Sequence, residues 1–137
     1  MNANPLIYTA LWEKLNVKHI DIRLMALQNF VWLCQFQGPI GQSYIRKAAE
    51  NYAQRHHKSP FTELIHSLNR VWDKEVRISA LQLINGLIVK CPTEKKLAKF
   101  LAHLENIGLY EELRSMSEIK NDAKLTGQLQ NFQVNTK

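Results

Sequence analysis

The chain has 137 residues, 45% of them hydrophobic and 22% charged, which is typical of one folded globular domain. Its two cysteines are too few for a disulfide-stapled secreted scaffold, and no signal-like segment begins it, so we expect a soluble domain in a reducing intracellular compartment. The longest apolar runs are far shorter than the ~20 residues that span a membrane. The net charge of +6 is the sum of +7 in residues 1–100 and −1 in residues 101–137. No nucleic-acid motif accompanies it, and we interpret it as a solvated basic surface.

Helical periodicity runs through nearly the whole chain. Pro5 behind Asn4 predicts the start of a first helix, whose apolar residues continue to Leu15. Further helices are predicted at about 19–37, 40–57, 61–68, 74–90, 93–107, 109–120 and 125–132. The breaks between them contain Gly-Pro, Ser-Pro or Cys-Pro pairs, or Gly108 as a helix cap. No alternating strand pattern of useful length appears, so we predict an all-α fold.

One helix recurs along the chain. Residues 21–33 align with residues 75–87, with five of thirteen positions identical and four more exchanged like for like. Such self-similarity is typical of helical solenoids. The offset exceeds the ~40–47 residues of an armadillo or HEAT unit, and we attribute the excess to a long helix over 40–57. We therefore predict an armadillo/HEAT-like right-handed helical solenoid of about two to three units. It forms a single domain over 1–137, with units at about 4–57 and 60–107 and C-terminal helices at 109–133.

A helical wheel divides the recurring helix into two sides. One side is apolar and predicted to be core: Ala26, Leu27, Phe30, Leu33, Cys34, Ala80, Leu81, Ile84, Leu87 and Ile88. The other side, which lines the concave surface in armadillo stacks, is the predicted partner-binding groove: Gln28, Val31, Trp32, Gln35, Gln82, Asn85 and Val89. Amide donors and acceptors beside a flat apolar anchor suit an inserted helical or extended peptide. The alternative is that Trp32 packs against a neighbouring unit.

No motif indicates an enzyme. The sequence lacks a Gly-rich phosphate loop, a nucleophile elbow and a His-Glu-x-x-His zinc helix. His56 and His57 have no cysteine or carboxylate at metal-ligand spacing, so we expect exposed histidines there. Cys91, His103 and Asn121 are the residues of a thiol-protease set, but Cys91 stands before a proline at a predicted helix end. We predict no catalytic residue, no cofactor and no metal site.

Several stretches resemble a known family. Residues 80–88 (Ala-Leu-Gln-Leu-Ile-Asn-Gly-Leu-Ile), Pro92, and residues 101–109 (Leu-Ala-His-Leu-Glu-Asn-Ile-Gly-Leu), with Glu112-Leu-Arg after them, are similar to the last armadillo units of diaphanous-type formins. Residues 128–132 (Gln-Leu-Gln-Asn-Phe) resemble the segment that leaves that region, and residues 23–34 match the preceding unit more loosely. The resemblance covers most of the chain and is most specific between 75 and 116.

The resemblance implies a non-catalytic protein-interaction domain, the diaphanous inhibitory (formin homology three) region. In such formins the C-terminal autoregulatory segment binds as an amphipathic helix in the concave groove, and a Rho-family GTPase displaces it. The domain is thereby linked to actin cytoskeleton organisation. Carried over by position, the groove comprises Gln28, Trp32, Gln35, Gln82 and Asn85. The resemblance further implies a cytoplasmic, cytoskeleton-associated protein that meets actin only indirectly, and we expect no DNA partner.

The chain departs from the family pattern in three respects. Trp32 stands where family members tend to have a small residue, and the body is basic although the autoregulatory segment is itself partly basic. Most N-terminal units, the GTPase-binding segment, a proline-rich run and the actin-nucleating domain have no counterpart in this sequence. We therefore expect a fragment of a longer formin or a truncated relative, with GTPase binding mainly through the missing units. An earlier unit or homo-oligomer formation would cover the apolar end at Leu6, Ile7 and Leu11.

A second functional class stays open from the sequence alone. Scattered basic residues predict an adaptor that binds nucleic acid or anionic membrane surfaces, with steep salt dependence. These residues are Arg46, Lys47, Arg55, Lys58 and the lysines of 95–99.

Overall fold

The computed structural model of the chain describes residues 5–136, and these residues form helices and connecting turns without a strand. The elements are α1 (Pro5–Glu13), the 3-10 turn η1 (Lys14–Asn16), α2 (Ile20–Phe36), α3 (Gly38–His56), α4 (Thr62–His66), α5 (Lys74–Val89), α6 (Glu94–Asn106), α7 (Leu109–Ser117) and α8 (Ala123–Asn135). The predicted all-α class is confirmed. Among the described helices, none has the length and apolar character needed to cross a bilayer.

The helix borders follow local residue chemistry. The side-chain oxygen of Thr93 caps α6 by accepting a hydrogen bond of 3.1 Å from the backbone N–H of Lys96. Gly38 and Gly108 adopt positive φ angles of 59° and 103°, which lets α3 follow α2, and α7 follow α6, after a single turn. The predicted cap Asn4 lies outside the described residues.

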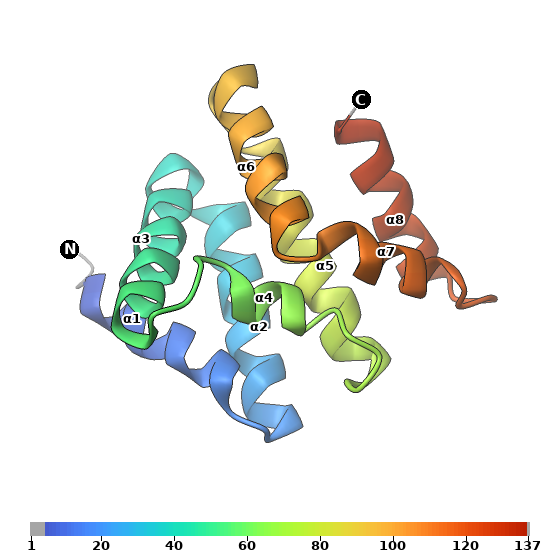
Figure 1. Cartoon of the computed structure of the whole chain (residues 1–137), viewed down its shortest axis with the longest axis horizontal. Helices are drawn as coiled ribbons and strands as arrows, with labels where there is room; N and C mark the ends of the chain where they lie inside the picture. Colours follow the sequence, from blue (N-terminus) through green and yellow to red (C-terminus); the bar gives the residue numbers. More distant parts are fainter. Residues whose placement is uncertain (1–4, 137) are drawn as a thin grey trace.

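The helices repeat one pattern three times: a first helix, a short helix or turn, and a closing helix. The three triplets are α1–η1–α2, α3–α4–α5 and α6–α7–α8. Their closing helices α2, α5 and α8 pack side by side in that order and form an inner row (Figure 1). The first helices α1, α3 and α6 form an outer row. The fold is the predicted armadillo-like solenoid, with triplets that begin at α1, α3 and α6, a different phase from the expected units at about 4–57 and 60–107.

Side-chain hydrogen bonds between consecutive triplets reveal the stacking period. They join residues that lie 42 to 44 positions apart: Thr9–Asn51, Glu13–Arg55, Arg23–Ser67, Pro60–His103, Asn69–Glu112 and Asn85–Gln128. This spacing is that of an armadillo unit. Residues 21–33 and 75–87, the recurring helix segments, are farther apart in the sequence than this stacking period. The excess arises in part because α3 has 19 residues where α6 has 13.

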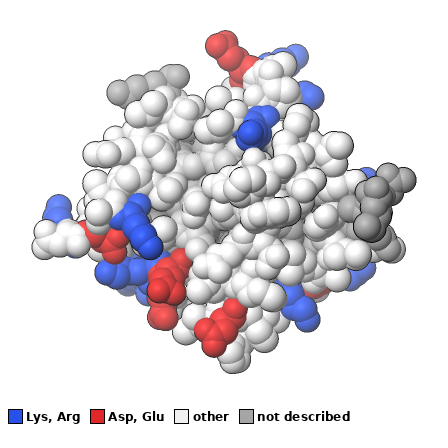
Figure 2. Space-filling view, turned by 180° about the vertical axis from the view of Figure 1, so that it is seen from behind, with Lys and Arg blue, Asp and Glu red and all other residues white. Residues whose placement is uncertain are grey.

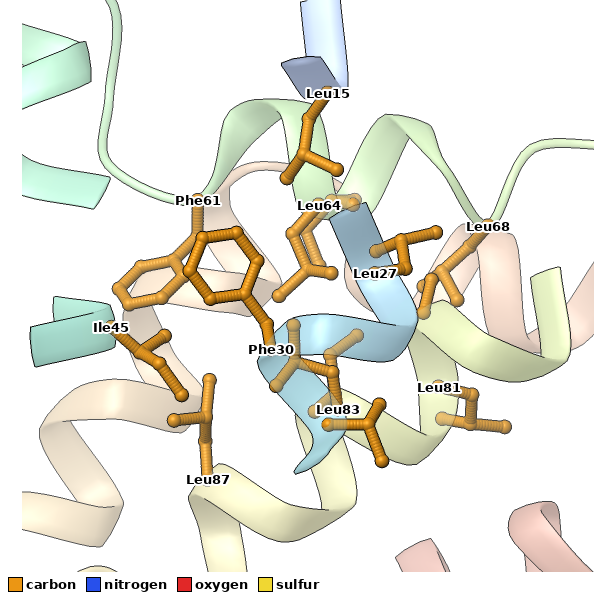
Figure 3. Packing of buried hydrophobic residues seen from close by; sticks show 14 of the residues in the cluster. Leu15, Leu27, Phe30, Ile45, Phe61, Leu64, Leu68, Leu81, Leu83 and Leu87 are labelled. Atoms are coloured by element: carbon orange, nitrogen blue, oxygen red, sulfur yellow. The ribbon is translucent and has the colours of Figure 1, made fainter. Parts of the chain in front are cut away.

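The hydrophobic core lies between the two rows and runs through all three triplets. All ten core residues predicted from the wheel are buried, each at most 5% exposed. Trp12 of α1 meets Phe30 of α2 edge-on at 5.0 Å and Phe61 at 5.7 Å between ring centroids. Figure 3 shows Phe30 and Phe61 packed together, with Leu83 and Leu87 of α5 below them. Because each such side chain contributes about 1.5–3 kcal/mol on burial, the shared core holds the inner row in place.

Candidate partner-binding groove

The inner row presents a surface with little charge, in which Lys90 at the end of α5 lines the groove described below. Residues 24–37 at the end of α2, 78–89 of α5 and 125–136 of α8 contain no lysine, arginine, aspartate, glutamate or histidine. Figure 2 views the molecule from behind, the side on which α2 and α5 lie, and shows a broad central area without charge. Depletion of charge, with amides and aromatic residues remaining, is characteristic of the central part of protein–protein interfaces.

A groove of about 220 Å³ lies between α2, α5 and α8 on this surface. Four predicted residues line it, and α8 adds three amides that the sequence analysis did not include: Gln35, Gln82, Asn85, Val89, Gln128, Asn131 and Asn135. Cys34, Gly86 and the exposed Lys90 complete the lining. Such amides offer both donors and acceptors to a bound segment. The charge-free composition of residues 125–136 is the signal that could have placed α8 in the site.

The predicted groove residues differ in accessibility. Gln28, Trp32, Gln35 and Val89 are exposed and Gln82 is half-buried. Val31 and Asn85, which occupy equivalent positions in the recurring helix, are buried at 8% and 5% exposure. The expectation that Val31 faces a partner therefore needs correction, because its side chain belongs to the hydrophobic core cluster.

Asn85 holds α8 in place. Its side-chain N–H group donates hydrogen bonds of 2.9 Å to the main-chain oxygen and to the side-chain oxygen of Gln128. Next to it, a Cβ atom built on Gly86 would lie 3.0 Å from the Cys34 sulfur, so glycine allows α2 and α5 to approach closely. Asn85 thus forms the floor of the groove as an anchor of α8.

Two aromatic side chains stand exposed at the end of α2. Trp32 is 54% and Phe36 67% exposed, and their ring centroids lie 5.6 Å apart. Phe36 did not enter the sequence prediction, although its spacing of four residues from Trp32 puts both on one side of the helix. An exposed aromatic pair on a charge-free surface is a typical anchor for a protein partner.

The residues considered for catalysis have structural partners. The guanidinium of Arg46 donates to the Cys91 sulfur at 3.3 Å, and a ring nitrogen of His103 lies 2.6 Å from the main-chain oxygen of Pro60. Burial raises the pKa of the Cys34 thiol, which keeps this sulfur protonated and unreactive at neutral pH. Across residues 5–136, no group of three or more His, Cys, Asp or Glu side chains is arranged to hold a metal ion.

Three of the basic residues behind the alternative hypothesis contact the chain itself. Arg55 pairs with Glu13 at 2.9 Å and Lys58 with Glu63 at 2.7 Å. The Arg46 guanidinium lies 4.4 Å from the ring centre of Phe100. The others are exposed along α3 and α6, outside the residues that line the groove: Lys47, Lys95, Lys96 and Lys99.

Comparison with known proteins gives two findings. The family model described as the FHOD1/3 FH3 domain matches residues 1–111. The chain is also 32% identical over 120 residues to Formin-G of Dictyostelium discoideum. That match covers 88% of this chain and 11% of Formin-G, so the chain spans a small part of that relative.

Proposed function

The chain belongs to the FH3 domain family of formins, and we propose that it holds an amphipathic helix in the groove between α2, α5 and α8. The resemblance to the formin homology three region predicted from the sequence is confirmed, and the matching model is that of the FHOD1/3 branch. Membership supports a regulatory, protein-interaction domain of formins. The finer assignment concerns which segment binds and through which residues.

The observation that carries the proposal is a groove lined by amide and apolar residues, in which Lys90 is the single charged lining residue. A helix laid into it meets an apolar contact from Val89, amide groups from Gln35, Gln82 and Asn131, and the side chain of Lys90. A partner helix can place apolar residues at i, i+3, i+4 and i+7 into such a groove. The polar groups of that helix can then form hydrogen bonds with the amides of the groove. A basic residue on the docking face would lose its hydration without gaining an ion pair, because the one charged side chain that lines the groove is that of Lys90.

We assign the occupant to the C-terminal autoregulatory segment of a formin. Release of this helix by a Rho-family GTPase would connect the domain to the control of actin assembly in the cytoplasm, with no direct actin contact by this chain. The basic residues of such a segment would lie outside the groove, because the groove has no acidic partner for them. Binding by apolar contacts and amide bonds is expected to depend only weakly on salt.

The test is a titration of a labelled autoregulatory peptide with the chain, followed by fluorescence anisotropy. We expect saturable binding whose Kd changes less than about threefold between ~50 and ~200 mM salt. Gln82→Lys and Val89→Lys put a charge into the groove without touching the core, and each should weaken binding by about tenfold or more. Lys47→Gln on the outer row is the matched control and should leave the Kd unchanged.

The basic-adaptor alternative makes the opposite prediction. It requires binding to nucleic acid or anionic vesicles that is lost steeply over the same salt range and weakened by Lys95→Gln and Lys99→Gln. Peptide binding that ignores Gln82→Lys and Val89→Lys would refute the groove as the site.

A further inference from the structure

A second cavity lies apart from the groove. Its volume is about 620 Å³, and it is bordered by the start of α2, by α4 and by the turns that flank these helices. We call it the α2–α4 pocket; it shares no lining residue with the groove. Its ionisable lining residues are three cations, one carboxylate and a histidine: Lys18, Arg23, Lys58, Glu63 and His66. The lining therefore carries a positive net charge.

Arg23 is a buried cation in this pocket. It is 2% exposed, and within residues 5–136 no carboxylate forms an ion pair with it. Its Nη1 atom donates a hydrogen bond to the Ser67 hydroxyl, whose own hydrogen goes to the main-chain oxygen of Glu63 at 2.9 Å. The Nε–H group of Arg23 is also buried and has no hydrogen-bond partner among the described residues. The guanidinium thus keeps one hydrogen-bonding side open.

Glu63 does not supply the missing counter-charge. Its Oε1 atom accepts a hydrogen bond of 2.7 Å from the Lys58 ammonium, so this carboxylate already has a cation of its own. Burial lowers the pKa of the Arg23 guanidinium, and the attraction of Glu63 offsets this only in part. Arg23 is nevertheless charged at neutral pH, as arginine is throughout proteins. The pocket therefore contains one buried positive charge for which the described chain provides no ion pair.

Trp72 adds a second open donor. Its indole Nε1–H group is buried and has no partner within residues 5–136, and Trp72 lines the same pocket. The Cζ atom of Arg23 lies 3.9 Å from the centre of the Trp72 ring, and this contact holds the guanidinium in position. Two N–H donors without acceptors in one cavity fit a ligand that presents acceptors only, which is the chemistry of an oxyanion.

The internal repeat shows how such an arginine is satisfied elsewhere in the fold. Arg77 of α5 occupies the position that Arg23 has in α2. Its Nε–H group donates a hydrogen bond of 2.8 Å to the main-chain oxygen of Leu68, while its Nη2 atom has no partner among the described residues. In α5 a carbonyl of the chain thus binds the Nε–H group that stays open at Arg23. The α2–α4 pocket leaves room for an acceptor from another molecule at this place.

Charge and shape favour a carboxylate as the ligand. A carboxylate balances the one charge of Arg23, whereas a phosphate dianion would bring a further negative charge that Glu63 repels. Its two oxygens also match the N–H fork of a guanidinium. Val71, which is 72% exposed, and Trp72 give the pocket an apolar border. We propose that the α2–α4 pocket binds an acidic residue of a partner protein, whose carboxylate meets Arg23 and Trp72 while a neighbouring apolar side chain packs on Val71.

NMR titration of the full chain with acetyl-Leu-Glu-amide, at constant ionic strength, tests the proposal. We expect saturable shifts of the Arg23 Nε–H and Trp72 indole N–H resonances with a Kd on the order of 1 mM. The indole resonances of Trp12 and Trp32 are internal controls and should not move. Acetyl-Leu-Gln-amide, which differs from the probe in charge, should bind about tenfold more weakly. Inorganic phosphate should also bind more weakly than the probe.

Two variants identify the pocket without removing a fully buried side chain. Trp72→Phe keeps an aromatic ring and removes the donor, and Lys18→Glu reverses an exposed charge of the lining. Followed at the Arg23 resonance, each should raise the Kd of acetyl-Leu-Glu-amide about threefold or more. Lys47→Glu makes the same charge change at an exposed position of α3 outside the pocket, and should leave this Kd unchanged. Unchanged helical circular dichroism shows that each variant is folded.

Several outcomes would overturn the proposal. They are an absence of shifts at Arg23 and Trp72, equal binding of the two peptides, and tighter binding of phosphate than of acetyl-Leu-Glu-amide. A Trp72→Phe variant that binds like the wild type, or equal effects of Lys18→Glu and Lys47→Glu, would overturn it as well. Because the pocket and the groove share no residue, Trp72→Phe should bind the autoregulatory peptide with an unchanged Kd. Failure of one site can therefore be distinguished from failure of the other.

Discussion

The inner and outer rows of this solenoid are stabilised by different forces. The closing helices α2, α5 and α8 carry charges only in their first turns, where Lys74 and Asp122 pair at 3.0 Å, and are otherwise joined by packing and amide bonds. The outer row is also packed, with Tyr8 of α1 stacked on Tyr44 of α3 at 5.0 Å between ring centroids. It adds ionic groups: Glu13 of α1 accepts from Arg55 of α3 at 2.9 Å, and a ring nitrogen of His56 lies 2.9 Å from the same carboxylate. Salt is therefore expected to act mainly on the outer row, while loss of core volume destabilises the inner row whatever the salt concentration.

One small domain thereby combines a solvated basic surface on the outer row with an amide-rich inner surface that carries little charge. Charges on the outer row keep the chain soluble and stay hydrated, so they contribute little to stability individually. Beyond its first turns, where Arg23 and Arg77 are buried, the inner row uses amides, which form hydrogen bonds without the desolvation cost of a charge. A partner helix can then bind to this row by displacing weakly held water.

The largest effect is expected from loss of volume in the inner row. Leu81 of α5 is fully buried, and Leu81→Ala should lower the free energy of unfolding by about 2–5 kcal/mol because it removes apolar contacts and leaves a cavity. The measurement is urea unfolding at low and high salt, and we expect the same loss at both. Val71→Ala, at a valine that is 72% exposed, is the control and should change stability by less than about 0.5 kcal/mol. A loss confined to low salt would contradict the division between the rows.

A smaller effect is expected from the amide contact between α5 and α8. Asn85→Ala removes two hydrogen bonds to Gln128 and should cost about 1–2 kcal/mol. Because the contact is local, amide hydrogen exchange should speed up in α8 more than in α2 or α3. Gln82→Ala, on the same helix with its side chain half-buried, is the matched control. Uniform acceleration in all helices would show that Asn85 stabilises the whole domain and not the docking of α8 in particular.

The inner helices α2 and α5 also show how much of the fold the sequence could predict. Helical periodicity and the repeat between α2 and α5 placed the core side correctly, because that side is set by the residues of one helix. The same wheel left Val31 and Asn85 on the open side, and both are buried. The reason is shared: in each inner helix this flank is covered by the next inner helix, α5 in one case and α8 in the other. A wheel of a single helix contains no information about its lateral neighbour.

The role of α8 escaped prediction for a related reason. Its residues do not repeat the pattern of α2 and α5, and leucines at 125 and 129 with Phe132 predicted a helix without saying where it packs. The position of α8 against α5 follows from the hydrogen bond between Asn85 and Gln128, which lie 43 positions apart. This stacking period can be recognised only from contacts between triplets.

The smallest expected effect belongs to the outer row. Glu13→Gln removes the pair with Arg55, whose side chain is 63% exposed, and should lower the free energy of unfolding by well under about 1 kcal/mol. Because the carboxylate is partly hydrated and the Arg55 head lies in solvent, the loss should shrink as salt is raised from ~50 mM to ~1 M. Urea unfolding of the wild type, Glu13→Gln and Arg55→Gln, with the double variant to complete the cycle, isolates the pair. Glu50→Gln, at an exposed glutamate of α3, controls for the change in net charge. A coupling energy that is large and indifferent to salt would mean that the outer row, like the inner row, is stabilised by groups shielded from water.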